Sequence, residues 1–374
     1  MKVALVHTRY RPDGGAEKAV VHTLNALALR GAEVKIITRG WVEGEGSVQV
    51  LPCNPFYLGR LWRKWGFIRE AKKILSELQV DIVQSQVRLS GCDIYRAGGG
   101  VHRELLRQRD RISNPLRRFL TRVSAYHGYK RHAERKLYAD ARLKAVICNS
   151  RMVGDEIVDY YGVPREKIHV IYNAVDHEKF DFKKNLEQRR ILRNKLGFDN
   201  DQTVFLFVGS GFERKGVSVL LDCMAALPKD CSLMVVGKES RVGKYYRKSR
   251  RLGISERVIF AGMQKDVVPY YAAADAFVLP TLYDAFANSV LEAMAASLPV
   301  ITSFKCGAVD IVENERNGFV CDSLDTRTII KYMHQMRDPA ARKSVGDAGR
   351  TTVAGFTTEN MSKHLYTLYE KILD

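Results

Sequence analysis

The stretch TVFLFVGSGFERKGVSVLLDCMAAL, residues 203–227, carries the strongest fold signal in the sequence. It begins with an apolar run that has the length of a buried strand, and it ends with an apolar stretch that has the length of a helix. Between them lies a turn that contains Gly209, Gly211, Arg214, Lys215 and Gly216. A strand, a tight turn and a helix in this order form part of a βαβ unit, the building block of parallel sheets.

The same alternation recurs along the whole chain of 374 residues, which is long for a single hydrophobic core. Short apolar runs separated by helix-length segments occur in two blocks, residues 1–173 and 174–357. We therefore predict an α/β protein with two doubly wound, Rossmann-like domains. The predicted strands are 3–7, 33–38, 48–52, 81–86, 145–150, 168–173, 203–209, 231–237, 257–262, 276–280, 299–302 and 318–321.

Amphipathic stretches predict the helices between these strands. The clearest in the first domain are 16–30, 61–78 and 115–138. A closing amphipathic helix at 358–374 is expected to pack back on the first domain. The polar stretch 176–190 has no apolar periodicity and is the best candidate for a hinge.

The net charge of +18 is unusual, and most of it lies in the first half. Residues 1–173 hold 31 lysines and arginines against 17 acidic residues, whereas residues 174–374 hold 29 against 25. Residues 103–144 alone hold 13 against 4. A local excess of this kind predicts an anionic partner, which nucleic acid, anionic lipid or phosphorylated glycolipid would satisfy. A merely solvated basic face is the alternative.

The remaining composition favours a cytoplasmic protein. Seven scattered cysteines without a CxxC pair predict buried free thiols in a reducing compartment. We expect neither a signal peptide nor a transmembrane helix, since no apolar stretch approaches the roughly 20 residues that a span requires. Residues 60–78 combine an apolar stripe with Trp62, Phe67 and flanking basic residues. This pattern fits an interfacial helix on the inner face of the cytoplasmic membrane, or an ordinary buried helix face.

The glycine turn at 208–217 is a candidate anion site. Ligands of parallel sheets bind beyond the carboxyl ends of the strands, where this turn lies. Glycines let the backbone approach a ligand closely, and the N-terminus of the following helix favours an anion. Arg214 and Lys215 add positive charge, so a phosphate or diphosphate is the expected ligand. Solubility alone would also explain basic residues in such a turn.

A second turn strengthens this interpretation. Asp284 follows the strand at 276–280, a helix is expected to begin at Asn288 and Ser289, and Glu292 falls on its second turn. Two anion-binding turns and two carboxylates suit a phosphate-linked molecule that is rich in hydroxyl groups, such as a nucleotide sugar. For Glu292, a solvated position on the helix is the alternative.

These motifs resemble the retaining glycosyltransferases of family 4, which have the GT-B fold of two Rossmann-like domains facing a cleft. Asp284-x7-Glu292 is similar to the family's Glu-x7-Glu, and residues 270–300, 171–176 and 11–20 resemble its other segments. The form GSGFERKGV at 209–217 resembles bacterial glucosyltransferases that add the first glucose to the heptose region of the lipopolysaccharide core. The resemblance implies a retaining hexosyltransferase that uses UDP-glucose and an anionic glycolipid acceptor.

The resemblance also assigns roles to single positions. Lys215 matches the family's diphosphate-binding lysine, and Arg214 is expected to replace the arginine that the family has at Ser210. Glu292 matches the carboxylate that accepts the donor's ribose hydroxyls. Asp284 matches the acidic residue beside the donor sugar, with a shorter side chain. The other residues expected to bind the donor through their backbone are Gly209, Phe286, Ala287, Asn288 and Ser289.

Glycine turns of the first half are expected to complete the site. Gly14 and Gly15 resemble a loop that approaches the donor phosphates from the opposing domain, although a simple tight turn would look the same. His102 follows three glycines and resembles the family's histidine near the reacting sugar, so we include it with Asp284 and Lys215 as catalytic. A structural histidine is the alternative, and His7 is a weaker candidate for the same role.

The implied mechanism needs no metal and no other cofactor. Arg214, Lys215 and the helix amides would stabilise the charge that develops on the departing diphosphate. That phosphate would take the proton of the acceptor hydroxyl. We interpret the DND sequence at 199–201 as a turn and not as a cation site.

Several alternatives remain open from the sequence. UDP-GlcNAc, UDP-galactose or GDP-mannose would fit the donor site, and the acceptor belongs to a lipopolysaccharide core or to another glycolipid or polysaccharide. An epimerase or a phosphorylase can share this architecture. The non-enzyme alternative is a basic nucleic-acid-binding protein, but the aromatic residues within 103–144 are few for that role. They are Phe119, Tyr126, Tyr129 and Tyr138.

Overall fold

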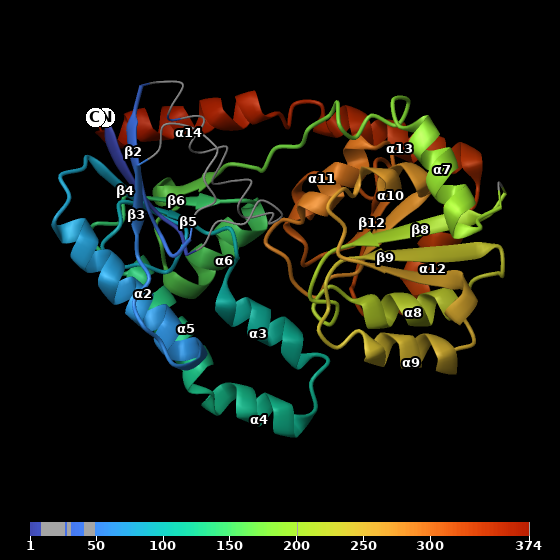
Figure 1. The fold of residues 1–374 in the computed structure, drawn as a ribbon, viewed down its shortest axis with the longest axis horizontal. Coiled ribbons are helices and arrows are strands. Elements are labelled where there is room, and N and C mark those ends of the chain that lie inside the picture. Colours follow the sequence, from blue (N-terminus) through green and yellow to red (C-terminus); the bar gives the residue numbers. More distant parts are fainter. Residues whose placement is uncertain (9–26, 28–30, 41–48, 200, 374) are drawn as a thin grey trace. The chain divides into compact units, whose positions relative to one another are not determined.

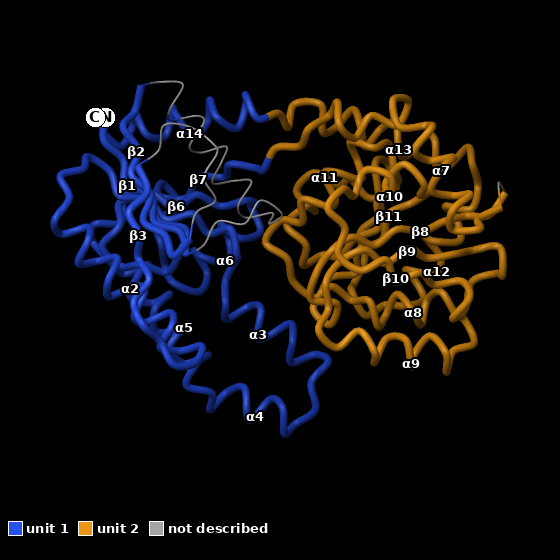
Figure 2. The backbone as a smooth tube through the Cα atoms, viewed as in Figure 1, with its two compact units in different colours: residues 1–173, 358–374 blue, residues 174–357 orange. Residues whose placement is uncertain are grey.

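The chain divides into two compact units, which the computed structural model describes over residues 1–8, 27, 31–40, 49–199 and 201–373. Unit 1 consists of residues 1–173 and 358–374, and unit 2 consists of residues 174–357 (Figure 2). Each unit has its own parallel sheet. The predicted helix at 16–30 falls outside the described residues apart from Leu27.

Unit 1 is built on a seven-stranded parallel sheet with the order β3-β2-β1-β4-β5-β6-β7 (Figure 1). The chain runs outward from β1 on one side and then returns to build the other side from β4, which is the doubly wound pattern. All four residues of β4 are buried, as expected for a sheet covered on both faces. The strands are β1 (Lys2–Val6), β2 (Glu33–Thr38), β3 (Gln49–Pro52), β4 (Ile82–Ser85), β5 (Ile94–Arg96), β6 (Ala145–Cys148) and β7 (Ile168–Val170).

The helices of unit 1 differ from the prediction in one place. The single helix predicted at 115–138 is wrong, because Ser124 has an extended backbone (ψ 118°) that separates two helices. Serine is a poor residue for a helix interior and a good one for helix ends. The described helices are α2 (Gly59–Ser76), α3 (His102–Asp110), α4 (Pro115–Val123), α5 (Ala125–Tyr138), α6 (Arg151–Tyr161), the 3-10 turn Arg165–Lys167 and α14 (Thr358–Leu373).

The closing helix α14 packs on the unit 1 sheet. Leu365 is fully buried, and the Tyr369 hydroxyl donates a hydrogen bond to the Gln84 side chain on β4. Lys144, just before β6, donates to the carbonyl of Ile372 at 3.2 Å. The last helix of the chain therefore belongs to the same unit as its first strand.

Unit 2 contains a six-stranded parallel sheet with the order β10-β9-β8-β11-β12-β13. Helices cover both faces of this sheet, with α8 and α9 on one side and α10 and α11 on the other (Figure 1). The strands are β8 (Thr203–Val208), β9 (Cys231–Val236), β10 (Val258–Gly262), β11 (Ala276–Leu279), β12 (Val300–Ser303) and β13 (Phe319–Cys321). The helices are α7 (Leu186–Leu196), α8 (Val217–Ala225), α9 (Gly243–Arg251), α10 (Val268–Ala273), α11 (Asn288–Ala295), α12 (Thr326–Gln335) and α13 (Pro339–Val353), with 3-10 turns at Ser255–Arg257 and Gly307–Asp310.

The predicted hinge at 176–190 extends too far, since α7 begins inside it at Leu186. Ion pairs hold α7 to the sheet: Arg189 lies 2.8 Å and Arg193 lies 3.2 Å from carboxylate oxygens of Asp275. Asp275 precedes β11 and also accepts a hydrogen bond from the Val204 amide of β8 at 2.8 Å. Charged side chains therefore anchor a helix that hydrophobic periodicity does not reveal.

Candidate active site

The two predicted turns meet at the carboxyl edge of the unit 2 sheet, where β8 and β11 are neighbouring strands. The Leu282 amide donates to the Arg214 carbonyl at 2.8 Å and joins the turns. Gly216 has φ 82°, and a Cβ there would lie 2.0 Å from the Pro280 carbonyl oxygen. Only glycine suits this position, because it accepts the left-handed backbone and leaves room for the second turn.

Arg214 and Lys215 converge on one carboxylate oxygen. The Arg214 guanidinium donates to Asp284 Oδ2 at 2.9 Å, and Lys215 Nζ lies 3.2 Å from the same oxygen. The side chains of Lys215 and Asp284 are only 12% and 14% exposed, so water screens their attraction less than that of a surface pair. Two cations facing one carboxylate leave this cluster with a net positive charge.

Asp284 is held in place by the backbone of the following loop. Its amide donates to the Lys305 carbonyl at 2.9 Å, and its carbonyl accepts from the Gly307 amide at 2.8 Å. Burial favours the neutral acid, but Lys215 and Arg214 outweigh it and lower the pKa of Asp284 to about 2. Asp284 is therefore ionised at neutral pH, and its short side chain is long enough to reach both cations.

Gly209 makes room for the lysine. A Cβ at position 209 would lie 2.6 Å from Lys215 Cδ, so the lysine side chain lies across this glycine. The loop after β9 also packs against Gly209, since a Cβ on Gly237 would lie 2.1 Å from the Gly209 carbonyl oxygen. The Phe212 amide donates to the Glu239 carboxylate of that loop at 3.0 Å. The sequence analysis did not single out Gly237 or Glu239.

Glu292 lies on α11, the helix that starts directly after the second turn. It is 9% exposed, and its Oε2 accepts a hydrogen bond from the Tyr271 hydroxyl at 2.8 Å. Burial and the charge of Glu292 raise the pKa of Tyr271, which therefore remains a hydrogen-bond donor. Tyr271 on α10 was missed, because a tyrosine within an apolar run carries no sign of a polar partner.

The amides predicted to bind the donor lie at the start of α11. Phe286 and Ala287 are buried, and Ala287 is the N-cap of the helix that Asn288 begins. The buried Ser289 hydroxyl has no hydrogen-bond partner among the described residues. Asp284, these residues and Glu292 thus follow one another around a single strand-to-helix turn.

Ser297 follows the C-terminus of α11 and has a left-handed backbone, with φ 57°. This conformation is strained for a residue with a side chain.

His102 is the first residue of α3 in unit 1 and is buried. Its Nε2 lies 3.0 Å from Nδ1 of His127, and its amide donates to the Glu134 carboxylate at 2.9 Å. Its Nδ1 has no partner among the described residues. Burial first, and then Lys130 and Arg88, lower the pKa of His102 to about 2. The imidazole is therefore neutral, and only hydrogen bonding, not cationic acid chemistry, is open to it at neutral pH.

The predicted site residues thus divide into three groups. Contacts join Gly209, Arg214, Lys215 and Asp284 directly, and Phe286 and Ala287 lead into α11, which carries Asn288, Ser289 and Glu292. His102 belongs to the other unit, where it contacts His127 and Glu134. Gly14 and Gly15 lie outside the described residues. His7, the competing histidine, is buried just after β1.

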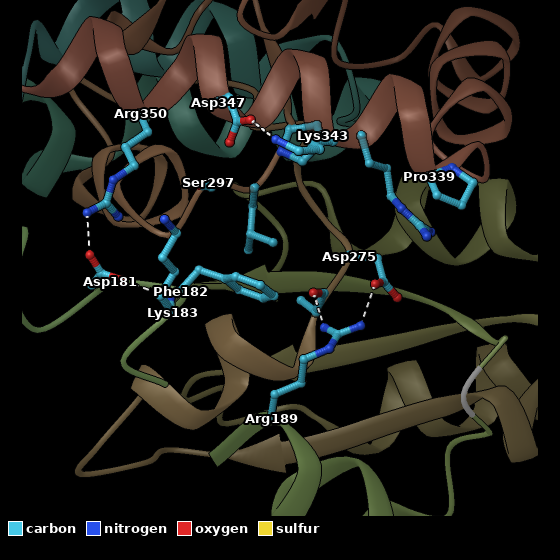
Figure 3. Close-up of a pocket in the computed structure, with 14 residues that line it drawn as sticks. Asp181, Phe182, Lys183, Arg189, Asp275, Ser297, Pro339, Lys343, Asp347 and Arg350 are labelled. Carbon is cyan, nitrogen blue, oxygen red and sulfur yellow. Dashed lines mark hydrogen bonds and ion pairs between the residues drawn. The ribbon is translucent and has the colours of Figure 1, made fainter. Parts of the chain in front are cut away.

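A pocket of about 610 Å³ lies elsewhere in unit 2 (Figure 3). Asp275 and Pro299 line it, and they precede β11 and β12, so the pocket is at the amino ends of the strands. Many of its charged side chains pair with one another, as Figure 3 shows for Arg350 with Asp181 and Lys343 with Asp347. Because parallel sheets bind ligands at the opposite edge, the Arg214–Lys215–Asp284 cluster remains the candidate site.

Two protein families match the chain, one in each half. The family described as Glycosyltransferase Family 4 matches residues 13–179, and the family described as Glycosyl transferases group 1 matches residues 188–352. The chain belongs to the GT-B glycosyltransferases. The predicted fold class and family are thereby confirmed, and the epimerase, phosphorylase and nucleic-acid-binding alternatives lose their support.

Relatives of this glycosyltransferase include two proteins of lipopolysaccharide synthesis. The lipopolysaccharide glucosyltransferase WaaG of Escherichia coli K12 is 26% identical over 330 residues, which are 86% of this chain and 85% of the relative. The lipopolysaccharide core biosynthesis glycosyltransferase LpsE of Rhizobium meliloti is 28% identical over 365 residues, which are 95% and 94% of the two chains.

Solved structures of the same fold cover the whole glycosyltransferase. WaaG, described as a glycosyltransferase involved in lipopolysaccharide biosynthesis, matches with a TM-score of 0.82 at 22% identity over 99% of each chain. Anabaena Alr3699/HepE in complex with UDP-glucose matches with a TM-score of 0.73 at 19% identity, over 99% of this chain and 100% of the other. At these identities the two structures establish the fold.

Proposed function

We propose that this protein is a retaining hexosyltransferase that moves glucose from UDP-glucose to the heptose region of a lipopolysaccharide core or to a similar glycolipid. The observation that carries the proposal is the convergence of Arg214 and Lys215 at the carboxyl edge of β8 and β11. The relatives WaaG and LpsE support the acceptor class, and the UDP-glucose complex of HepE supports the donor class.

In this proposal the cluster stabilises the leaving group. The bond between the sugar C1 and the diphosphate oxygen breaks, and negative charge develops on the UDP that departs. Arg214 and Lys215 would move part of their interaction from Asp284 to the diphosphate, and the amides at the start of α11 would add hydrogen bonds. A metal ion is not needed where two side-chain cations already neutralise this charge.

The other site residues would position the donor and the acceptor. Glu292, whose carboxylate accepts a hydrogen bond from Tyr271, would accept hydrogen bonds from the ribose hydroxyls. Asp284 would lie beside the donor sugar. The acceptor hydroxyl would attack C1 from the face that the diphosphate leaves, and its proton would pass to the departing phosphate. His102 would act as a neutral hydrogen-bond partner of a sugar hydroxyl through Nδ1.

We further propose that the protein works in the cytoplasm at the inner face of the membrane. None of the described helices is both long and apolar enough to cross a bilayer. Helix α4 instead exposes an apolar stripe with i, i+3, i+4, i+7 spacing: Leu116 (66% exposed), Phe119 (60%), Leu120 (56%) and Val123 (61%). Arg117, Arg118 and Arg122 lie on the same helix, which has no acidic residue. This combination suits an anionic lipid surface.

Helix α2 and its preceding segment also expose apolar side chains. Phe56, Leu58 and Trp62 are 77%, 75% and 44% exposed, and the rings of Phe56 and Trp62 are in edge contact at 5.9 Å. Phe67, by contrast, is buried, so only part of the aromatic pattern in 60–78 is open to a bilayer. The apolar side chains of α2 are therefore partly buried and partly exposed, and its contact with a bilayer stays a prediction.

The test of the enzymatic proposal is a donor panel with purified, deglucosylated core glycolipid. We expect transfer from UDP-glucose, an α-linked product by NMR, and an unchanged rate in EDTA. Transfer only from UDP-GlcNAc, UDP-galactose or GDP-mannose would overturn the donor assignment. A β-linked product would overturn the retaining mechanism, and loss of activity in EDTA that Mg²⁺ restores would overturn metal independence.

A further inference from the structure

Unit 1 contains a pocket of about 190 Å³ that none of the predicted site residues lines. Three basic side chains line it: Lys64 from α2, Arg88 from the loop after β4, and Lys130 from α5. Among the described residues that line it there is no aspartate or glutamate. The pocket thus gathers positive charge from three separate elements.

Among the described residues, the charges in the pocket are not balanced. Arg88 is paired, because its guanidinium lies 2.7 Å from the fully buried Glu134 carboxylate. Lys64 and Lys130 form no ion pair with any described residue, and Lys130 instead lies 5.0 Å from the centre of the Tyr126 ring. With Arg88 neutralised by Glu134, Lys64 and Lys130 carry the excess positive charge among the described residues that line the pocket.

This excess of charge is costly to the protein. Burial, Arg88 and Arg60 lower the pKa of Lys130 to about 8, against the opposing effect of Glu134. Burial also lowers the pKa of Lys64, and Lys130 and Arg88 contribute to that decrease. A bound anion would relieve this repulsion, since an opposite charge favours the protonated form of each lysine.

The pocket also offers a neutral donor and a size limit. The Gln86 side chain lines it, and its buried Nε2 has no hydrogen-bond partner among the described residues.

An ordered water occupies about 30 Å³, so the volume of the pocket corresponds to roughly six waters. Pockets for whole drug-sized ligands measure roughly 300–1,000 Å³. The pocket therefore has room for one charged group and not for a sugar nucleotide.

The pocket shares its buried carboxylate with His102. Glu134 Oε1 accepts hydrogen bonds from both Arg88 and the amide of His102, at 2.8 Å and 2.9 Å. Arg88 also donates to the carbonyl of Gly100, two residues before the histidine, at 3.4 Å. An anion in the pocket would thus lie next to the histidine that we expect at the reacting sugar, which favours an acceptor group over a distant regulator.

We propose that Lys64, Lys130 and Gln86 bind an oxyanion, a phosphate or a carboxylate, that the acceptor carries near its reacting hydroxyl. The assignment of this oxyanion to the acceptor rests on the proposed function, whereas the anion site itself does not. The pocket selects acidic acceptors, and Arg88 and Glu134 fix its wall.

Anion binding is tested on the full chain, saturated with UDP so that the Arg214–Lys215 cluster is already occupied, with inorganic phosphate and, in parallel, acetate at constant ionic strength. The variant is Lys64→Ala with Lys130→Ala. The control is Lys73→Ala with Lys136→Ala, which removes the same charge from exposed positions of the same two helices. At ten times its Kd an anion should raise the Tm of the wild type and the control by on the order of 3 °C, and leave the variant unchanged. The anion that acts identifies the group, and equal shifts in all three proteins, or none, overturn the proposal.

The acceptor assignment is tested with two acceptors, the acidic core glycolipid and a neutral alkyl glycoside of the same acceptor sugar. The Lys64/Lys130 variant should lose roughly ten- to hundredfold in kcat/KM for the acidic acceptor, as expected for charge-assisted hydrogen bonds, and little for the neutral one. An equal loss for both acceptors overturns the assignment. If no donor supports transfer while phosphate still stabilises only proteins that retain both lysines, the anion site stands and the proposed function fails.

Discussion

At the level of single residues, the candidate site consists of two cationic side chains and one carboxylate that interact with one another. Arg214 and Lys215 both face Asp284, so the carboxylate keeps the two cations close together. From the sequence, all three could be predicted as site residues. The sequence does not predict their convergence on one oxygen, because that depends on how the Gly216 turn packs against Pro280.

Lys215→Ala should leave the fold intact and lower kcat by roughly 10²–10³-fold, the usual cost of removing one donor that stabilises a developing anion. The measurement is the steady-state transfer rate with UDP-glucose and core glycolipid. Lys229→Ala serves as the control, since Lys229 is exposed in the turn before β9. A Lys215→Ala enzyme with near wild-type kcat would remove the cluster from the mechanism.

The lowered pKa of His102 has a consequence for stability. The folded protein keeps His102 neutral, whereas the unfolded chain binds a proton near pH 6.5. The free energy of unfolding is therefore unaffected by His102 above pH 6.5. Below pH 6.5 it decreases by about 1.4 kcal/mol per pH unit, because only the unfolded chain binds the proton. Urea unfolding between pH 7 and pH 5 should show a shallower loss of stability for His102→Gln than for the wild type. Parallel curves would show that His102 is not held neutral.

At the scale of elements, the two left-handed glycines of the β8–α8 turn make a matched pair. Gly211 and Gly216 have φ 78° and 82°. A Cβ at Gly216 would clash with the Pro280 carbonyl oxygen, whereas a Cβ at Gly211 would meet no described atom within 4 Å. Gly211→Ala should cost about 1 kcal/mol in the free energy of unfolding, from backbone strain alone. Gly216→Ala should cost about 3 kcal/mol, because the turn must also move away from Pro280.

Denaturant unfolding of both glycine variants checks this difference, and UDP binding gives a second readout. Because the Gly216 turn positions both cations, Gly216→Ala should weaken UDP binding more than Gly211→Ala. Equal stability and equal UDP affinity of the two variants would contradict the close packing of the two turns.

Most strands were predictable because apolar runs mark strands buried on both faces, as in β8 and β9. The three-residue strand β5 was missed, since it is too short to form such a run and leads into a glycine loop. The break at Ser124 and the start of α7 were also missed. At Ser124 the backbone turns extended, and α7 is anchored by ion pairs to the distant Asp275; hydrophobic periodicity reports neither feature.

The same limit applied to the candidate site. The turn residues Arg214, Lys215, Asp284 and Glu292 were identified through their motif. Their supports, Tyr271 and Glu239, were not, because a hydrogen bond between distant elements leaves no local pattern. For the cationic pocket of unit 1, the sequence indicated only an excess of basic residues. It could not indicate the pocket itself, because α2, the loop after β4 and α5 are separated along the chain.

At the scale of the whole molecule, the basic charge and the exposed stripe of α4 predict membrane binding. Replacing Leu116, Phe119, Leu120 and Val123 by serine should weaken binding to vesicles rich in phosphatidylglycerol at least tenfold, with the Tm unchanged because these side chains are already exposed. The readout is co-sedimentation with vesicles.

The control for this prediction is Leu186→Ser with Ile191→Ser, which removes exposed apolar side chains from α7 of unit 2. Binding to anionic vesicles should also fall as salt is raised, because the electrostatic part of the attraction is screened. If the α4 variant binds as the wild type does, α4 is not the membrane contact.

The most direct test of the central claim is a crystal structure of the protein with UDP. The account predicts β-phosphate oxygens within about 2.7–3.2 Å of Lys215 Nζ and the Arg214 guanidinium, with the ribose hydroxyls on the Glu292 carboxylate. UDP bound at the amino ends of the strands, near Asp275 and Arg342, with Lys215 and Arg214 still bonded only to Asp284, would contradict it.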